Sequence, residues 1–448
     1  MKKTVVYIIA VSLFAAATGY IIIRFNKEQK QKQATIYPLV ERKGVLQKDA
    51  DWEEIKGKSK VLINNAARNS ADNKSRLALI QLYLQEARIT GNYSYYDMAA
   101  MKTVNDILRN DPGNFEALTY KAMIFLSQHH FSEGLEAARE LQKINPYNSF
   151  VYGLLVDGNV ETGNYSEAVE NADKMVSIRP DIRSYSRISY LREIHGDYDG
   201  AIEAMKLAVD AGIPGSEGTE WARVQLGRLY ENTGNLEAAK NQYFISLQTR
   251  PSYPYALAGM ARMAAAAKDY RKAIGYYWSA DSVISDYSFK EECADIYMLM
   301  GEKDSAMQLY SAVINEMEQA AEQSAKYDSV GHYSDLEMAQ VYLKLNKLDK
   351  ALEHAFAEYN RRPGNIEVNE TVAWIHYRNG NDEKALQYLS VAMKTRCRNP
   401  TLLNRAGLIY ARAGEKSKAK SLLEEGLRGN PNIAESLKEQ SIAVLRKL

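Results

Sequence analysis

Cysteine, histidine and excess charge are all scarce in this chain, and each scarcity excludes a class of protein. The 448 residues include only two cysteines, Cys293 and Cys397, more than a hundred positions apart, so a disulfide framework is excluded. Six histidines occur, without an H-x-x-x-H or C-x-x-C spacing, so we predict no metal site and no cofactor. Lys and Arg total 57 and Asp and Glu 56, so no net field favours nucleic acid.

Motifs that carry catalysis are absent as well. Neither the G-x-G-x-x-G fingerprint nor the phosphate-binding loop occurs, and the three glycines in residues 212–218 follow no strand, so a turn insertion explains them. Cys293 is expected to be a small core residue. Cys397 stands between two arginines that could lower its pKa, but we expect an exposed cysteine without a role. The sequence therefore predicts a protein that is not an enzyme.

Residues 1–25 contain an uncharged apolar run. Thr4–Ile23 is twenty residues without a charge, just long enough to cross a bilayer as a helix at about 1.5 Å per residue. The run also fits a signal peptide, with two lysines ahead of it and an A-x-A cleavage site at residues 15–17. Apolar residues continue beyond that site, which favours an uncleaved anchor. We predict a transmembrane anchor in residues 1–25, with a signal peptide as the alternative.

The charges around this segment give conflicting predictions of orientation. Four basic residues within positions 24–32 outnumber the two ahead of the run, which weakly favours a cytoplasmic body. A short basic start followed directly by an apolar run is the usual export signal and favours the opposite side. We expect a membrane-anchored or exported protein with a periplasmic body, and a cytoplasmic body as the alternative. Residues 26–50, rich in Lys and Gln, are expected to form a polar tether.

A regular period governs the chain from about residue 77 onwards. The steps between Pro112, Pro146, Pro180 and Pro214 are all equal. Between successive prolines, a glycine ends one helical stretch, an aromatic residue or leucine packs over the turn, and a small residue lets a second helix approach the first. Proline then closes the second helix. Apolar residues recur at helical spacing and nothing alternates as a strand does, so we predict an all-α chain.

These units resemble the tetratricopeptide repeat, a helix–turn–helix unit of about 34 residues. One close copy contains Leu226-Gly227-x-x-Tyr230, Gly234, Ala239, Tyr243 and Pro251, and another contains Ala406-Gly407-x-x-Tyr410, Gly414, Ala419, Leu423 and Pro431. The resemblance covers about ten copies, in residues 77–431, and implies a right-handed α-solenoid. Extra residues within 316–331 are expected to lengthen one second helix. A leading helix in 51–76 and a capping helix in 432–448 complete the prediction.

The resemblance also implies a binding surface. In this family, exposed positions of the first helices line a concave groove that holds an extended peptide or a partner helix. The corresponding positions here include Tyr190, Trp221, Arg228, Tyr255, Arg262, Asp295, Tyr333, Trp374, Tyr377 and Arg378. Tyr, Trp and Arg are enriched at binding hot spots. Arg228 and Arg262 are one repeat period apart, so we expect them to stack in adjacent units and to grip a carboxylate together.

We therefore expect a protein-binding scaffold or adaptor at a bacterial-type cell envelope, without cofactor, metal or nucleic acid. Two alternatives stay open. The array could be a regulatory or carrier subunit of an enzyme complex, or it could bind a carbohydrate or another small ligand through its aromatic side chains. The last of these predicts a discrete pocket in place of a continuous groove. Fold alone does not decide between them.

Overall fold

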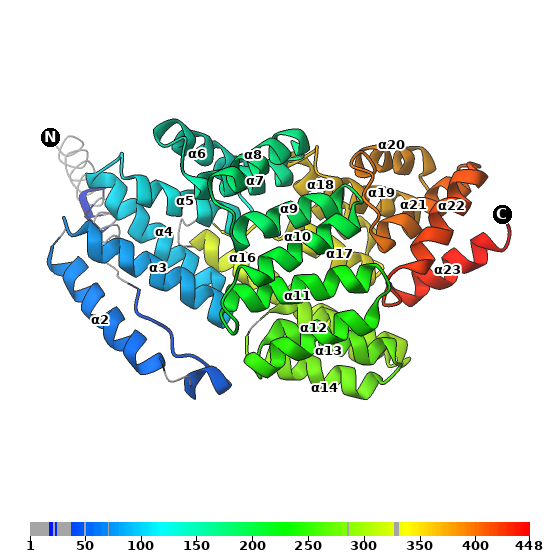
Figure 1. Cartoon of the computed structure of the whole chain (residues 1–448), viewed down its shortest axis with the longest axis horizontal. Coiled ribbons are helices and arrows are strands. Elements are labelled where there is room, and N and C mark those ends of the chain that lie inside the picture. The colour runs from blue at the N-terminus through cyan, green and yellow to red at the C-terminus, as the bar shows by residue number, and fades with distance from the viewer. Residues whose placement is uncertain are drawn as a thin grey trace, which may run out of the picture.

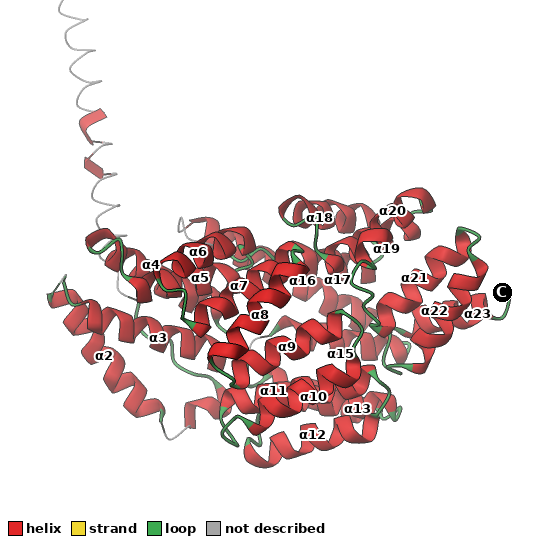
Figure 2. Cartoon of the chain, turned by 45° about the horizontal axis from the view of Figure 1, so that its top comes forward, coloured by secondary structure: helices red, strands yellow, loops and turns green. Residues whose placement is uncertain are grey.

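The computed structural model describes residues 18–20, 23–24, 37–48, 51–69, 71–284, 286–326 and 331–448. Every regular element within these ranges is a helix, and none is a strand, which confirms the predicted all-α architecture (Figure 2). The helices lie side by side in antiparallel pairs that follow one another along a coiled array, with the chain's C-terminus at its far end (Figure 1).

Ten helix pairs make up the described array. They are α3 (Asn73–Thr90) with α4 (Tyr93–Asn110), α5 (Phe115–Ser127) with α6 (Phe131–Ile144), α7 (Ser149–Thr162) with α8 (Tyr165–Ile178), α9 (Ile182–Ile194) with α10 (Tyr198–Asp210), α11 (Glu217–Asn232) with α12 (Leu236–Thr249), α13 (Pro254–Ala266) with α14 (Tyr270–Asp281), α15 (Tyr287–Leu299) with α16 (Lys303–Lys326), α17 (Asp335–Lys344) with α18 (Leu348–Arg361), α19 (Ile366–Arg378) with α20 (Asp382–Ala392), and α21 (Pro400–Arg412) with α22 (Lys416–Arg428). The 24-residue α16 is the longest, as the extra residues in its unit predicted.

The pair α11–α12 shows why the sequence forms these units. Gly234 takes a φ of +79° at the turn, a conformation that glycine adopts without strain. Ala239 is fully buried where the two helices approach. The ring of Tyr243, also fully buried, lies against Gly227 and Gly259, where an added Cβ would come within 2.4 and 2.6 Å of it. Two glycines thus let one tyrosine pack between α11 and the next unit's α13.

The array coils tightly enough that segments far apart in the sequence touch. Asn365 Nδ2 donates to the carbonyl oxygen of Glu161 at 3.1 Å, across 204 residues of sequence. The Ile366 amide donates to the hydroxyl of Tyr165 at 3.0 Å, and Asn430 bonds to Asn232 at 3.4 Å across 198 residues. In Figures 1 and 2, α17 to α19 accordingly lie beside α7 to α9. We call these contacts the coil closure.

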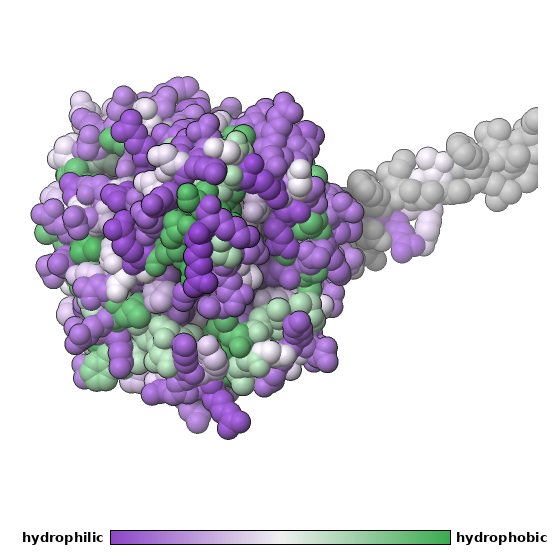
Figure 3. Space-filling model, turned by 90° about the vertical axis from the view of Figure 1, so that its right-hand side faces the viewer, coloured by the Kyte–Doolittle hydropathy of each residue, from purple (hydrophilic) through white to green (hydrophobic). Residues whose placement is uncertain are grey.

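Both ends of the array are covered. At the start, α2 (Trp52–Arg68) packs on α3. At the other end, α23 (Glu435–Leu445) buries Leu437 against the last units. The molecule's surface at this end carries mainly hydrophilic side chains with scattered hydrophobic ones (Figure 3), as a solenoid cap requires.

Residues 37–48, part of the expected polar tether, pack against α3 and α4. The Tyr95 hydroxyl donates to the carbonyl oxygen of Pro38 at 2.6 Å. Arg42 and Glu86 form an ion pair at 2.7 Å with both side chains fully buried, and the 3-10 helix η1 (Gly44–Lys48) follows. Residues 25–36 and 49–50 of the chain lie outside the described ranges.

The predicted membrane-anchored or exported location needs correction. No helix in the described parts of the chain is both long enough and apolar enough to cross a membrane. The anchor or signal peptide predicted in residues 1–25 falls almost wholly outside those parts, which include only residues 18–20 and 23–24 of it.

Candidate functional site

The first helices of the first six pairs line a central cavity of about 2350 Å³. Residues of α3, α5, α7, α9, α11 and α13 provide most of its wall, so it follows the concave side of the coil. Aromatic side chains recur along this wall, among them Tyr93, Tyr120, Phe150, Tyr190, Trp221 and Tyr255. The cavity combines a large apolar area with polar groups, which is the composition of a binding surface.

Four of the predicted groove residues, Tyr190, Trp221, Arg228 and Tyr255, line this cavity. Tyr190 is 37% exposed and Trp221 40%, although large aromatic side chains are usually buried. The phenolic hydroxyl of Tyr190 is protonated at neutral pH and can donate a hydrogen bond. These rings therefore stand at the cavity wall, where a ligand can reach them.

Some of the charged groups that line the cavity have partners within the protein. Arg187 donates from Nε to Asp157 at 2.8 Å, and the two side chains also form an ion pair. Glu193 accepts a hydrogen bond from Asn232, and burial raises the pKa of its carboxyl group. Arg228 is exposed, and its side chain forms no hydrogen bond or ion pair with any described residue, which also holds for Arg88 and Arg183 of the same wall. The guanidinium of Arg228 is therefore available to a carboxylate from outside.

Arg262 and Asp295 do not line the cavity and are bound within the protein. Arg262 donates from Nε to Glu231 at 3.1 Å and from Nη1 to Glu292 at 3.2 Å. Asp295 accepts from the Tyr310 hydroxyl at 2.5 Å and from a lysine of α17 at 2.7 Å. The structure therefore does not bring Arg262 and Arg228 together as a free pair.

The four remaining predicted residues also have partners inside the array. Trp374 is 6% exposed and stacks on Tyr377 with ring centroids 4.9 Å apart, while Arg412 lies 3.7 Å above the Tyr377 ring. Arg378 donates to the side chain of Asn346 at 2.8 Å. Tyr333 precedes α17 and stacks on a histidine of the α5–α6 turn, so it belongs to the coil closure.

The two cysteines are both buried. Cys293 is 1% exposed, as expected for a core residue. The expectation of an exposed Cys397 is wrong, because this side chain is 7% exposed and packs in the cluster between α8, α19 and α21. Burial raises the pKa of each thiol to about 12, opposite to the lowering that flanking arginines could cause. Neither thiol has the reactivity of a nucleophile at neutral pH.

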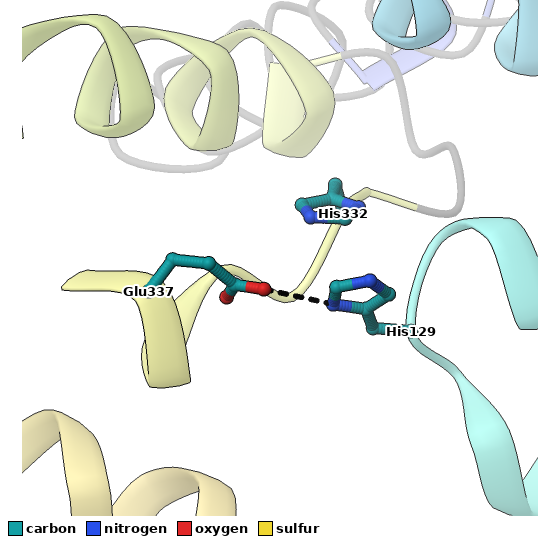
Figure 4. Close-up of side chains that lie close together, drawn as sticks. All are labelled: His129, His332 and Glu337. Carbon is teal, nitrogen blue, oxygen red and sulfur yellow. Dashed lines mark ion pairs between the residues drawn. The ribbon is translucent and has the colours of Figure 1, made fainter. Parts of the chain in front are cut away.

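The metal-ligand spacings sought in the sequence did not reveal one cluster of polar side chains. His129, His332 and Glu337 each offer a nitrogen or oxygen atom, and these atoms all lie within 4.8 Å of one another. Figure 4 shows the three side chains converging from the α5–α6 turn, from the segment before α17 and from the start of α17. His332 and Glu337 are far from His129 in the sequence, so only the coil closure assembles the three.

Comparisons with known proteins agree with a helical repeat. The tetratricopeptide repeat family model matches residues 222–243, in α11 and α12. No curated protein matches the chain. Among solved structures, TTC0263, a thermophilic tetratricopeptide protein of Thermus thermophilus, is 22% identical over 42% of this chain and 95% of its own, with a TM-score of 0.36. PilW, a type IV pilus biogenesis factor, is 16% identical over 45% of this chain and 92% of its own, with a TM-score of 0.38.

The human IFIT1 dimer with m7Gppp-AAAA is 15% identical over 72% of this chain and 71% of its own, with a TM-score of 0.47. At such identities these likenesses concern the fold alone. The chain's own helix pairs and the match to the repeat model describe a solenoid of units similar to tetratricopeptide repeats. What the other proteins bind or assemble is a property of those proteins.

Proposed function

We propose that the chain is a non-catalytic scaffold that holds a segment of a partner protein in its central cavity. The observation that supports this most directly is the state of Tyr190, Trp221 and Arg228. All three stand exposed on the cavity wall, and Arg228 forms no ion pair with any described residue. Exposed aromatic and arginine side chains in one concavity are the features of a binding hot spot.

The size of the cavity favours a polypeptide over a small ligand. Pockets for small molecules usually measure roughly 300–1000 Å³. The cavity here measures about 2350 Å³ and extends over six first helices. A carbohydrate or metabolite would contact only part of such a wall, whereas an extended peptide or a partner helix can follow it from one unit to the next.

The chemistry of the wall indicates what the partner segment carries. Tyr190 and Trp221 offer flat apolar faces with little rotamer entropy to lose, which suits apolar or aromatic side chains. Arg228 offers a planar fork of donors that binds a carboxylate with two parallel hydrogen bonds. We therefore expect a segment in which apolar residues accompany Asp, Glu or a C-terminal carboxylate.

The test selects binders from a random peptide library displayed on phage, with the full chain as bait. Binding of the selected peptides is then measured to the wild type and to Trp221→Ala and Arg228→Glu. Removal of a hot-spot aromatic residue costs about 2 kcal/mol or more, so we expect at least a roughly thirtyfold loss of affinity for each variant.

The chain offers a matched control for each variant. Trp278, on α14, is 42% exposed, nearly the same as Trp221, but lies outside the cavity. Arg271 is likewise an exposed arginine on α14. Trp278→Ala and Arg271→Glu should bind the peptides as the wild type does. If the cavity variants bind as tightly as these controls, or if the controls lose binding equally, the cavity is not the binding site.

A further inference from the structure

The cluster of His129, His332 and Glu337 has the ligand types of a transition-metal site. Nδ1 of His129 lies 3.7 Å from Oε1 of Glu337, and the two histidine rings have centroids 4.1 Å apart. Two imidazoles and one carboxylate bind Zn²⁺ in many proteins and leave a fourth position for water. The three side chains are partly exposed, so an ion can reach them from solvent.

Each imidazole has a backbone partner that can hold its ring in place for a metal. His129 Nδ1 lies 3.0 Å from the carbonyl oxygen of Tyr333, which can only accept, so Nδ1 carries the proton and Nε2 is the nitrogen left for a metal; His332 bonds to the backbone of Ser127. Hydrogen bonds from metal-binding histidines to backbone carbonyls usually fix the orientation of the ring.

One oxygen of the cluster's carboxylate lacks a partner. Oε2 of Glu337 is buried without a hydrogen bond. A buried, unsatisfied carboxylate oxygen costs free energy unless a cation or a donor reaches it. A metal ion between the carboxylate and the two rings would supply that cation.

The charges around the cluster leave room for a divalent ion. The nearest guanidinium is that of Arg362, which disfavours protonation of His129. It is already bound, because it forms ion pairs with Glu161 and Glu358. His130, next to His129 in the sequence, is also occupied, since its Nε2 lies 2.7 Å from the carbonyl oxygen of Gly331.

We propose that His129, His332 and Glu337 bind one transition-metal dication, of the kind represented by Zn²⁺, which ties together two turns of the coil. His129 belongs to the turn between α5 and α6, whereas His332 lies just before α17 and Glu337 lies in the first turn of α17. The ion would therefore cross-link units that are far apart in the sequence, beside the hydrogen bond from the Tyr333 amide to the Gln128 carbonyl oxygen. This inference is independent of the cavity.

The test titrates ZnCl₂ and CoCl₂ separately into the purified full chain, freed of metal beforehand, and follows binding by calorimetry. We expect one equivalent of either ion to bind, and the visible absorption of Co²⁺ to report nitrogen and oxygen ligands. His332→Ala and Glu337→Gln should each weaken binding at least roughly tenfold to a hundredfold. His129 has a φ of +60°, so His129→Asn is the suitable third variant, because Asn tolerates this conformation.

His195→Ala is the matched control, since this histidine is exposed and bonds only to its own helix. MgCl₂ serves as the control ion, because Mg²⁺ prefers oxygen ligands. Saturating Zn²⁺ should also raise the thermal unfolding midpoint of the wild type and of His195→Ala, but not that of His332→Ala. The proposal is overturned if the wild type binds no Zn²⁺ at micromolar concentration, or if His332→Ala binds it as tightly as His195→Ala.

Discussion

The first six units and the last four use the same face of their first helices in different ways. In the first six, Tyr190 and Trp221 stand exposed at a cavity wall. In the last four, Trp374 is buried on Tyr377, and Arg378 is bonded to a neighbouring unit. Residues at the same position in different repeats therefore do not have the same role.

Two arginines of the next unit explain much of this difference. The guanidinium of Arg405 lies 5.4 Å above the ring of Trp374, and that of Arg412 lies 3.7 Å above Tyr377, so each aromatic residue is covered by a cation from the next unit. Trp221 has no such cover and is 40% exposed. Where an arginine of the next unit covers an aromatic ring, the ring becomes a contact between units.

The largest expected effect on stability comes from reversing the charge at Arg262. This side chain joins Glu231, which is 3% exposed, and Glu292. Arg262→Glu would place a third carboxylate beside these two, so we expect a loss of about 4–5 kcal/mol in the free energy of unfolding, as for other broken buried ion pairs. Urea unfolding followed by circular dichroism measures this loss.

Arg228→Glu is the control for that variant, because Arg228 has the same phase one unit earlier but is exposed. Its effect on the free energy of unfolding should be clearly smaller than that of Arg262→Glu, because Arg228 acts on Glu193 and Glu292 only through its charge and forms no hydrogen bond or ion pair with a described residue. If the two substitutions destabilise the protein equally, Arg228 is not the exposed, unpaired arginine and Arg262 the ion-paired one that the structure describes.

The second effect concerns the two tryptophans. Trp374→Ala removes a ring that is 6% exposed and leaves a cavity, which should cost about 3–5 kcal/mol of unfolding free energy. Trp221→Ala removes a ring that is 40% exposed and should cost less than about 1 kcal/mol. Thermal and urea unfolding of both variants compare the halves directly. A loss at Trp221 as large as that at Trp374 would show that the cavity wall is closed in solution.

The third effect is a pH dependence of opposite sign in the two halves. Burial raises the pKa of Asp97, which is 1% exposed, from 3.8 to about 6. The folded state therefore holds this proton more tightly than the unfolded state, and the stability gained is complete below pH 3.8 and lost as the pH rises through 6. The ionised carboxylate costs roughly 3 kcal/mol above that range. Asp97→Asn should therefore gain stability relative to the wild type as the pH rises from about 4 to 7.

Asp335, in the later half, has its pKa lowered despite burial, because His354 and Arg361 bond to its carboxylate. Its contribution to stability is present above pH 3.8 and is lost as the pH falls through its lowered pKa. Asp335→Asn should therefore be destabilised at neutral pH, with the deficit shrinking in acid. The test measures the thermal unfolding midpoint of each variant relative to the wild type across this pH range. The difference should rise with pH for Asp97→Asn and fall with pH for Asp335→Asn. If both differences change with pH in the same direction, the pKa shifts given for the two residues are wrong.

The sequence predicted the local unit well, because the unit depends on neighbouring residues. The turn at Gly234 and the buried Ala239 are visible in the repeat period. The coil closure was not predictable, since it depends on the small rotation between successive units, summed over several of them. For that reason nothing in the sequence indicated that His129 meets His332. The pairing of Arg262 inside the protein could have been predicted, because acidic residues lie about one unit away on both sides, at Glu231 and Glu292.

The smallest effect tests whether the two parts of the array touch in solution. Gly163 and Gly414 have almost the same φ, +85° and +86°, so alanine strains the backbone equally at both, by about 1 kcal/mol. An added Cβ at Gly414 meets nothing within 4 Å, whereas one at Gly163 would lie 2.3 Å from the backbone of Gly364, in the coil closure. Gly163→Ala should therefore destabilise the protein by about 1–3 kcal/mol more than Gly414→Ala.

Small-angle X-ray scattering gives the second measurement for this pair. If alanine at position 163 pushes α8 and α19 apart, the radius of gyration should rise relative to the wild type, while Gly414→Ala leaves it unchanged. Equal stability and equal dimensions of the two variants would mean that the coil is open in solution. In that case the last four units would not pack against the first six. The difference between the exposed aromatic residues of the cavity wall and the buried ones of the later units would then have to arise from contacts between neighbouring units alone.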